Sequence, residues 1–426
     1  MGLLVFLAAL FVLLLIGVPI AIALGGCAIV LMLFLNQFNP LLLAQQMVVG
    51  VNSFPLMAIP FFMLAGEIMS KGGLSKRIVD FANVLMGRIR GGLGYTAIVA
   101  SIIFAGLSGS AVADAAALGG ILLPLMTVQG YRKERASGFI CAGAIIAPII
   151  PPSIPMIVLG TSVGLSISRM FMSGIVPGVI LGIALMVVWY FVVRIDDYHD
   201  VVRFTREEGL RTIASSLPAL FMPILIVGGI RLGIFTPTEA GAFAVVYAIL
   251  VCMFVYKELT WKGLMESLVA ACKSTATVMF ICATASAVAW LITIAQVPAM
   301  AVQLFGNLIG HPMLLMLVIN VFLFLMGMVM DLTPNILIFA PVLFPVITAA
   351  GIDPYYFALI MTLNLCIGMI SPPVGTVLYV GCGVAKISFT QIVKGVFPFL
   401  MVELVTLILF IAFPSLVTVP LNLIMG

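Results

Sequence analysis

The feature that most constrains the fold is an internal repeat. When the chain is shifted by 221 residues, many glycine, proline and threonine positions fall on identical residues without a gap. The matched pairs are Gly106 with Gly327, Pro124 with Pro345, Thr127 with Thr348, Gly130 with Gly351, Pro151-Pro152 with Pro372-Pro373, Gly160 with Gly381, Gly174 with Gly395, and Pro177 with Pro398. Glycine and proline interrupt or end helices. The shared register therefore predicts two copies of one structural unit.

The composition places this repeat in a membrane. Of the 426 residues, 64% are hydrophobic and only 8% are charged, whereas about 25% of residues are charged in a typical soluble protein. A bilayer-spanning helix needs about 20 mostly apolar residues, and the apolar segments lack the alternation of membrane barrel strands. We therefore expect an all-α integral membrane protein with one polytopic domain over residues 1–426. The few charges form no basic face, which argues against nucleic acid as a partner.

Each copy of the repeat contains two interruptions. An apolar segment is broken at 106–114 in the first copy and at 327–335 in the second, which predicts helical hairpins over 93–128 and 311–350. The long apolar segment that follows each hairpin contains a proline pair, which unwinds a helix because proline lacks an N–H. Freed backbone groups at membrane depth must be buried in protein or line a wet cavity. The prediction is two re-entrant hairpins and two broken helices.

The charges near the two hairpins predict that the copies have opposite orientations. Gly130 precedes Arg132, Lys133 and Arg135, whereas no lysine or arginine follows Gly351 at the matching turn. The positive-inside rule then makes only the first turn cytoplasmic. Five membrane-crossing helices are expected between the two turns. Because five is odd, the second copy also has the opposite orientation by this count. Inverted repeats with paired broken helices are typical of secondary transporters whose site lies near the middle of the membrane.

Polar residues gather at these interruptions. The candidate site residues are Ser108, Gly109, Ser110 and Asp114 in the first hairpin, Pro151, Pro152 and Ser153 in the first broken helix, Asp331, Thr333 and Asn335 in the second hairpin, and Ser371, Pro372, Pro373, Gly375 and Thr376 in the second broken helix. Unwound carbonyls and hydroxyls suit a small hard cation, and helix N-termini favour a carboxylate. The set predicts sodium and an organic anion bound together, with no cofactor and no catalytic residue.

Two aspartates stand out within this set. Burying an aspartate in a membrane costs at least about 2.5 kcal/mol, so Asp114 and Asp331 are expected to be functional. In the repeat, Ser110 corresponds to Asp331 and Asp114 corresponds to Asn335. Each copy therefore has one aspartate and one neutral polar residue four positions apart. The aspartate comes second in the first copy and first in the second copy. Two glutamates in or beside apolar runs, Glu67 and Glu403, have no counterpart in the repeat. A structural pair or an interfacial position is the favoured interpretation for them.

The sequence also leaves two alternative functions. The segment Gly106–Gly109 matches the short motif of intramembrane serine proteases, with Ser108 as nucleophile, but such a serine needs a histidine base within reach. The chain has only His199, in a charged loop, and His311, at a predicted helix edge. The protease is therefore disfavoured. Within the transporters, an ion- or proton-coupled anion transporter that needs no partner protein stays as the alternative.

Five ordered segments resemble the large membrane subunit of tripartite ATP-independent periplasmic (TRAP) transporters. They are Phe104–Gly119, Ile149–Ser153, Thr236–Gly241, Met330–Pro334 and Ile370–Thr376. The resemblance implies a multi-pass protein of the bacterial inner membrane that imports an organic acid, such as sialic acid or a C4-dicarboxylate, with sodium. It also implies two partners, a small membrane subunit of the same transporter and a periplasmic protein that delivers substrate.

The same resemblance implies an elevator mechanism of the ion-transporter-superfamily type. The transport repeats would be 93–170 and 311–387, with scaffold and connecting helices at 1–92 and 171–310 and a C-terminal helix at 388–426. One sodium site would join the first hairpin to the first broken helix. A second would join the second hairpin to the second broken helix.

Overall fold

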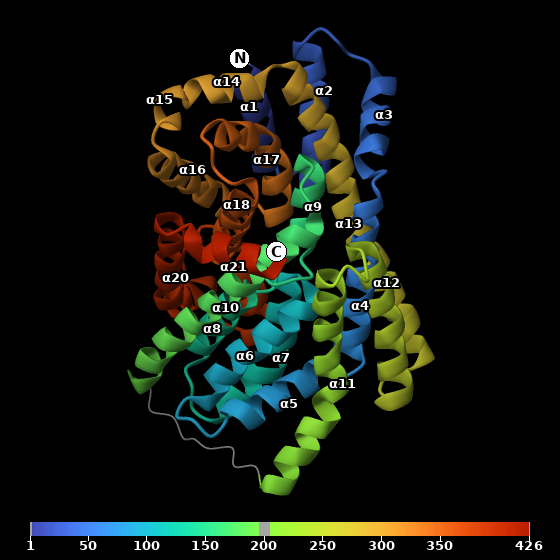
Figure 1. Ribbon diagram of the computed structural model, residues 1–426, viewed down its shortest axis with the longest axis vertical. Coiled ribbons are helices and arrows are strands. Elements are labelled where there is room, and N and C mark those ends of the chain that lie inside the picture. The colour runs from blue at the N-terminus through green and yellow to red at the C-terminus, as the bar shows by residue number, and fades with distance from the viewer. Residues whose placement is uncertain (1, 196–204, 426) are drawn as a thin grey trace.

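The computed structural model describes residues 2–195 and 205–425, and the described chain folds into helices joined by short loops (Figure 1). Within these ranges, eight helices are long and apolar enough to cross a membrane. Large apolar side chains stay exposed on the outside of long helices, such as Ile224 and Ile408, which are 66% and 55% exposed. Exposed apolar side chains along long helices suit contact with lipid. The predicted all-α membrane bundle is confirmed.

The first helices form a group of their own before the repeat begins. They are α1 (Gly2–Leu15), α2 (Ile20–Phe34), α3 (Pro40–Val51), the short 3-10 helix η1 (Phe54–Met57), α4 (Ala58–Lys71) and α5 (Leu74–Met86). On α5, the buried residues Leu74 and Ile78 recur one turn apart, and basic residues lie between them. This is the amphipathic pattern of a helix that lies along the membrane surface.

The two copies of the repeat fold into the same five helices. The first copy comprises α6 (Gly92–Ser108), α7 (Ala111–Val128), α8 (Lys133–Ala144), α9 (Ile154–Val163) and α10 (Ile167–Val192), and the second comprises α16 (Pro312–Gly327), α17 (Leu332–Ala349), α18 (Pro354–Gly368), α19 (Thr376–Ala385) and α20 (Phe389–Ala412). The bounds of α7 and α17 coincide under the shift of 221 residues. Gly130 and Gly351, with φ of +91° and +70°, occupy the matching turns.

The remaining helices connect the copies and close the chain. They are the 3-10 turn η2 (Val193–Ile195), α11 (Arg206–Arg231), α12 (Pro237–Leu250) with the π-helical turn η3 (Val251–Val255), α13 (Trp261–Ile294), α14 (Val297–Leu304), α15 (Gly306–Ile309) and α21 (Ser415–Met425). Residues 388–426 were expected to form one C-terminal helix, but α20 ends at Ala412 and α21 follows. Pro414 separates them, because proline cannot continue the hydrogen bonding of the preceding turn.

The copies interlock through their hairpins and broken helices. Helix α6 packs against α7, and α16 against α17, so each copy begins with a helical hairpin. The second arm of each hairpin also contacts the second half of the other copy's broken helix, since α7 packs against α19 and α17 against α9. In Figure 1, α6 and α7 lie in the lower half of the molecule and α16 and α17 in the upper half. This arrangement is the one expected of inverted copies.

Close backbone crossings explain why the repeat retains glycine at some positions. A Cβ atom on Gly174 would lie 1.9 Å from the carbonyl oxygen of Ile149, and one on Gly395 would lie 1.9 Å from that of Glu134. Any side chain would force these segments apart. Small residues at such crossings let membrane helices approach closely, so both glycines hold α10 and α20 tightly against the chain around the broken helices.

Candidate ion and substrate site

The first hairpin tip is a tight turn between α6 and α7. Gly109 takes the left-handed conformation with φ of +60°, and Ser110 caps α7 by accepting a hydrogen bond from the Ala113 N–H at 3.4 Å. The Ser110 N–H donates to Ser108 Oγ at 3.3 Å, and the Ser108 hydroxyl in turn donates to the Asp114 carboxylate. Capping by serine satisfies one free N–H of the helix start. The tip therefore concentrates oxygen atoms at the N-terminus of α7.

The first broken helix meets this tip through its backbone. A Cβ on Gly109 would lie only 2.4 Å from the Pro152 carbonyl oxygen and 3.2 Å from Ser153 Cα, so tip and loop are in direct contact. Ser153 is fully buried and caps α9 by accepting from the Met156 N–H at 3.2 Å. Its hydroxyl donates to the Pro148 carbonyl at 2.5 Å. The structure thus brings together the residues that were predicted for the first site.

The second hairpin tip carries its acid at the equivalent cap position. Asp331 precedes α17, and its carboxylate accepts no capping hydrogen bond from that helix. Unlike Asp114, it is exposed. It lies near Thr376, whose buried hydroxyl has no hydrogen-bond partner among the described residues. The Asp331 carboxylate and the Thr376 hydroxyl therefore lie beside each other at the second tip.

The second broken helix also contacts its hairpin. The Val374 N–H donates to the Met328 carbonyl at 3.3 Å, which joins the loop to the tip. Gly375 has a φ of +59° and begins α19. The Ser371 hydroxyl is used locally, because it donates to the Ile367 carbonyl at 2.8 Å. Thr333 is almost fully buried within the first turn of α17. The predicted residues of the second site are again close together.

One buried oxygen is left without a partner at the same repeat position in each copy. Asp114 and Asn335 are both 0% exposed. Asp114 Oδ1 accepts from Ser108, but Oδ2 has no partner among the described residues. Asn335 Nδ2 donates to the Met330 carbonyl at 2.9 Å, but Oδ1 has no partner there. An unsatisfied buried acceptor costs about 1–3 kcal/mol, so both positions are suited to a donor or a cation.

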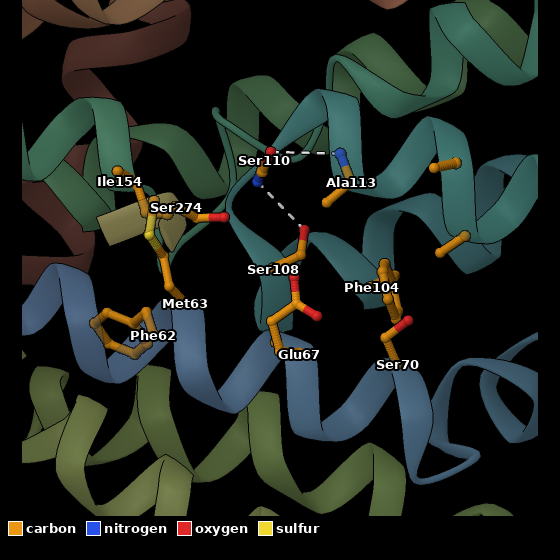
Figure 2. Close-up of a pocket in the computed structure, with 13 residues that line it drawn as sticks. Phe62, Met63, Glu67, Ser70, Phe104, Ser108, Ser110, Ala113, Ile154 and Ser274 are labelled. Atoms are coloured by element: carbon orange, nitrogen blue, oxygen red, sulfur yellow. Dashed lines mark hydrogen bonds between the residues drawn. The ribbon is translucent and has the colours of Figure 1, made fainter. Parts of the chain in front are cut away.

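A cavity of about 410 Å³ lies between the first tip and two helices outside the repeat (Figure 2). Ser108 and Ser110 line it from the tip, and Glu67 from α4 projects toward the same space. Sequence reasoning gave Glu67 a structural role, because it has no counterpart in the repeat. The available signal was an acid within an apolar helix. Only the packing of α4 against α6 shows which side it faces.

A second cavity, of about 300 Å³, lies in contact with other parts of the repeats. Thr161 and Ser162 line it from α9, and Pro341 lines it from α17. Gly50 on α3 and Ser286 on α13 line the opposite side. Both cavities therefore lie where residues of the repeats face helices outside them.

The arrangement does not support hydrolysis by Ser108. Its hydroxyl donates to a carboxylate instead of to a histidine. His311 is exposed at the start of α16, and His199 lies outside the described residues. Among the residues described around the cavity, none is a histidine. The general base that serine nucleophiles require is therefore missing from this part of the chain.

Paired hairpins, paired broken helices and polar tips define a secondary transporter. Residues 7–416 match the family described as "Tripartite ATP-independent periplasmic transporter, DctM component". The chain is 48% identical over 422 residues, 99% of each protein, to the 2,3-diketo-L-gulonate TRAP transporter large permease of Escherichia coli K12. It is 37% identical over 362 residues, 85% of each, to the C4-dicarboxylate TRAP transporter large permease of Pseudomonas aeruginosa.

A solved structure shares the fold. The crystal structure of the Alcanivorax borkumensis YdaH transporter aligns with a TM-score of 0.67 at 14% identity and covers 88% of both chains. The chain therefore belongs to the DctM family of TRAP large permeases. As a member of that family it is a multi-pass protein of the inner membrane and a secondary transporter of organic acids, not an enzyme.

Proposed function

We propose that the chain imports an organic acid, of the sugar-acid or dicarboxylate type, together with sodium ions by an elevator mechanism. The observation that carries the proposal is the unpartnered buried oxygen of Asp114 at the tip that touches the first broken helix. A sodium ion bound there would satisfy it. Oxygen atoms are the ligands that such a hard cation prefers.

Two sodium sites follow from the two tips. The first would use Ser108, Gly109, Ser110, Asp114, Pro151, Pro152 and Ser153, and the second Asp331, Thr333, Asn335, Ser371, Pro372, Pro373, Gly375 and Thr376. These residues include no lysine, arginine or histidine. The negative charge of the substrate would therefore be balanced by the bound ions and by the N-terminus of α7. Because the bound ions would balance this charge, substrate binding would depend on sodium.

The elevator step rests on where the two cavities lie. Residues of 93–170 line one side of the first cavity, and residues of both 93–170 and 311–387 line one side of the second. Helices α3, α4 and α13 contribute to the opposite sides. We infer that 93–170 and 311–387 move together as a transport unit against a scaffold formed by 1–92 and 171–310. Ions and substrate that satisfy the polar tips lower the cost of moving them past apolar helices. Empty tips would hinder the movement.

Two partners complete the proposal. A small permease of the same transporter would contact the scaffold, and a periplasmic binding protein would deliver the acid. The extent of identity to the 2,3-diketo-L-gulonate relative supports a sugar acid, whereas the dicarboxylate relative supports a C4 acid. An anion transporter that works without partners is the alternative, and the requirement for an added binding protein separates the two.

Uptake into liposomes tests the proposal. The permease is reconstituted with its small subunit, and the binding protein is added outside with radiolabelled acid under an inward sodium or potassium gradient. We expect uptake only with sodium and binding protein. Ser108→Ala should reduce it by about tenfold, since a hydrogen bond to a charged group is lost, while Ser215→Ala on the exposed side of α11 leaves it unchanged. Equal uptake in both gradients, or normal uptake by Ser108→Ala, would contradict the assignment.

A further inference from the structure

The cavity beside the first tip contains a carboxylate that the proposed sodium sites do not use. Glu67 projects into this cavity from α4 (Figure 2), and the other polar side chains that line it are Ser70, Ser108, Ser110 and Ser274. Glu67 is the charged residue of the described lining, which includes no basic side chain. The remaining wall is apolar. A substrate in this cavity therefore meets hydroxyl groups and one negative charge.

The carboxylate of Glu67 is available to such a substrate. Over the described part of the chain, no hydrogen bond or ion pair engages it. One turn further along α4, Lys71 pairs with Glu266 of α13 at 3.2 Å and so is held away from Glu67 by a partner of its own. Carboxylates in or beside apolar helices normally find a partner in the protein. The free acceptor oxygens of Glu67 thus face the cavity.

We infer that Glu67 selects acids that carry one carboxylate and several hydroxyl groups. An ionised carboxylate accepts up to about four hydrogen bonds, so it can hold two neighbouring hydroxyls of a sugar acid at once. Bonds of this charge-assisted kind are stronger than those between neutral groups. The inference rests on the proposed function, because the substrate must lie between the first tip and α4.

The same group rejects dicarboxylates. If one carboxylate of a succinate-like acid lies at the N-terminus of α7 beside the ion, the second lies toward α4 and meets Glu67. Like charges that face each other in a partly desolvated cavity repel, and such a repulsive element contributes to specificity as much as an attractive contact. The cavity volume of about 410 Å³ falls within the range of roughly 300–1,000 Å³ typical of small-molecule sites. Charge, more than size, decides between the two substrate types.

Binding to the purified permease tests this selection. D-gluconate and N-acetylneuraminate serve as hydroxyl-bearing monocarboxylates and succinate as the dicarboxylate, each titrated calorimetrically in sodium. We expect the native protein to bind both sugar acids more tightly than succinate. Glu67→Gln should weaken sugar-acid binding by roughly tenfold to a hundredfold and improve succinate binding. Glu207→Gln, which removes an exposed carboxylate on α11 outside the cavity lining, should change neither.

Several results would overturn the inference. Succinate binding that is tighter than sugar-acid binding in the native protein would do so, as would no detectable sugar-acid binding or an unchanged preference in Glu67→Gln. Loss of sodium stabilisation in Glu67→Gln would make the residue a cation ligand instead. Thermal unfolding in sodium and potassium, measured without any acid, separates these results from failure of the proposed function. If sodium does not stabilise the native protein, it is the sodium-coupled function that has failed.

Discussion

The two hairpin tips share their repeat positions but differ in exposure. At the first tip, Asp114 is completely buried and engaged by Ser108, and the facing loop is buried too. At the second, Asp331 is exposed, and Pro373 in the facing loop is exposed as well. The first site is thus closed around its acid, whereas the second is open. The two copies share the backbone of the tip, but the acid is at the buried position in the first copy and at the cap position in the second.

This difference in exposure predicts different roles for Asp114 and Asp331. A buried carboxylate supports the structure of its tip, because removing it leaves other buried groups without partners. An exposed carboxylate at the start of a helix can bind or release an ion with little effect on the surrounding packing. We therefore expect changes at the first tip to affect both stability and transport, and changes at the second to affect transport alone.

The largest effect is expected from Gly109→Ala at the closed tip. The new Cβ would lie 2.4 Å from the Pro152 carbonyl in a left-handed backbone, so strain of about 1–2 kcal/mol adds to overpacking of about 1–3 kcal/mol. Thermal unfolding should show a loss of about 3 kcal/mol, with uptake abolished. Gly351→Ala is the control, since its φ is +70° but nothing lies within 4 Å of the added atom. Equal losses in both variants would show that tip and loop do not touch.

An intermediate effect is expected when the two acids are compared directly. In potassium, Asp114→Ala should lower the free energy of unfolding by about 2 kcal/mol, because the buried Ser108 hydroxyl loses its acceptor. Asp331→Ala should stay within about 0.5 kcal/mol of the native protein, as surface changes usually do. Denaturation of both variants in detergent measures the difference. If Asp331→Ala proved the more destabilised of the two, the contrast between a closed and an open tip would be wrong.

The smallest effect is expected from Ser153→Ala in the first broken helix. Loss of a helix cap costs about 1 kcal/mol, and here the bond to the Pro148 carbonyl is lost as well. Ser166→Ala is the control, because Ser166 caps α10 with the same hydroxyl group but is exposed, so that water can replace the lost hydrogen bond. We expect Ser153→Ala to lower the melting temperature more than Ser166→Ala. The reverse order would place the first loop in a wetter environment than the structure shows.

The shared register of glycine and proline predicted much of this architecture. It located both hairpins and both broken helices, because those residues act on the backbone within one or two turns. Asp114 and Asp331 were predicted on separate grounds, because an acid within an apolar membrane segment is costly to bury. The closed and open states of the tips could not be predicted, since they depend on contacts such as that of Gly109 with Pro152, which join separate segments.

The position of Glu67 at the cavity was missed for a related reason. Its neighbours in the cavity come from helices distant in the sequence, including Ser274 on α13. An acid that lacks a repeat counterpart looks structural until the facing helix is known. The C-terminal segment differs more simply, because one helix was expected over 388–426 and the chain forms two, on either side of Pro414. Local signals predicted the repeated elements, and tertiary packing decided which side chains face the site.

Thermal unfolding of the purified protein in sodium and in an equal concentration of potassium tests the central claim most directly. An ion that binds only the folded state raises the melting temperature. We expect sodium to stabilise the native protein specifically and to stabilise Asp331→Ala much less, while Glu266→Gln behaves like the native protein. Identical melting temperatures in the two salts, with or without added acid, would contradict sodium binding at the hairpin tips.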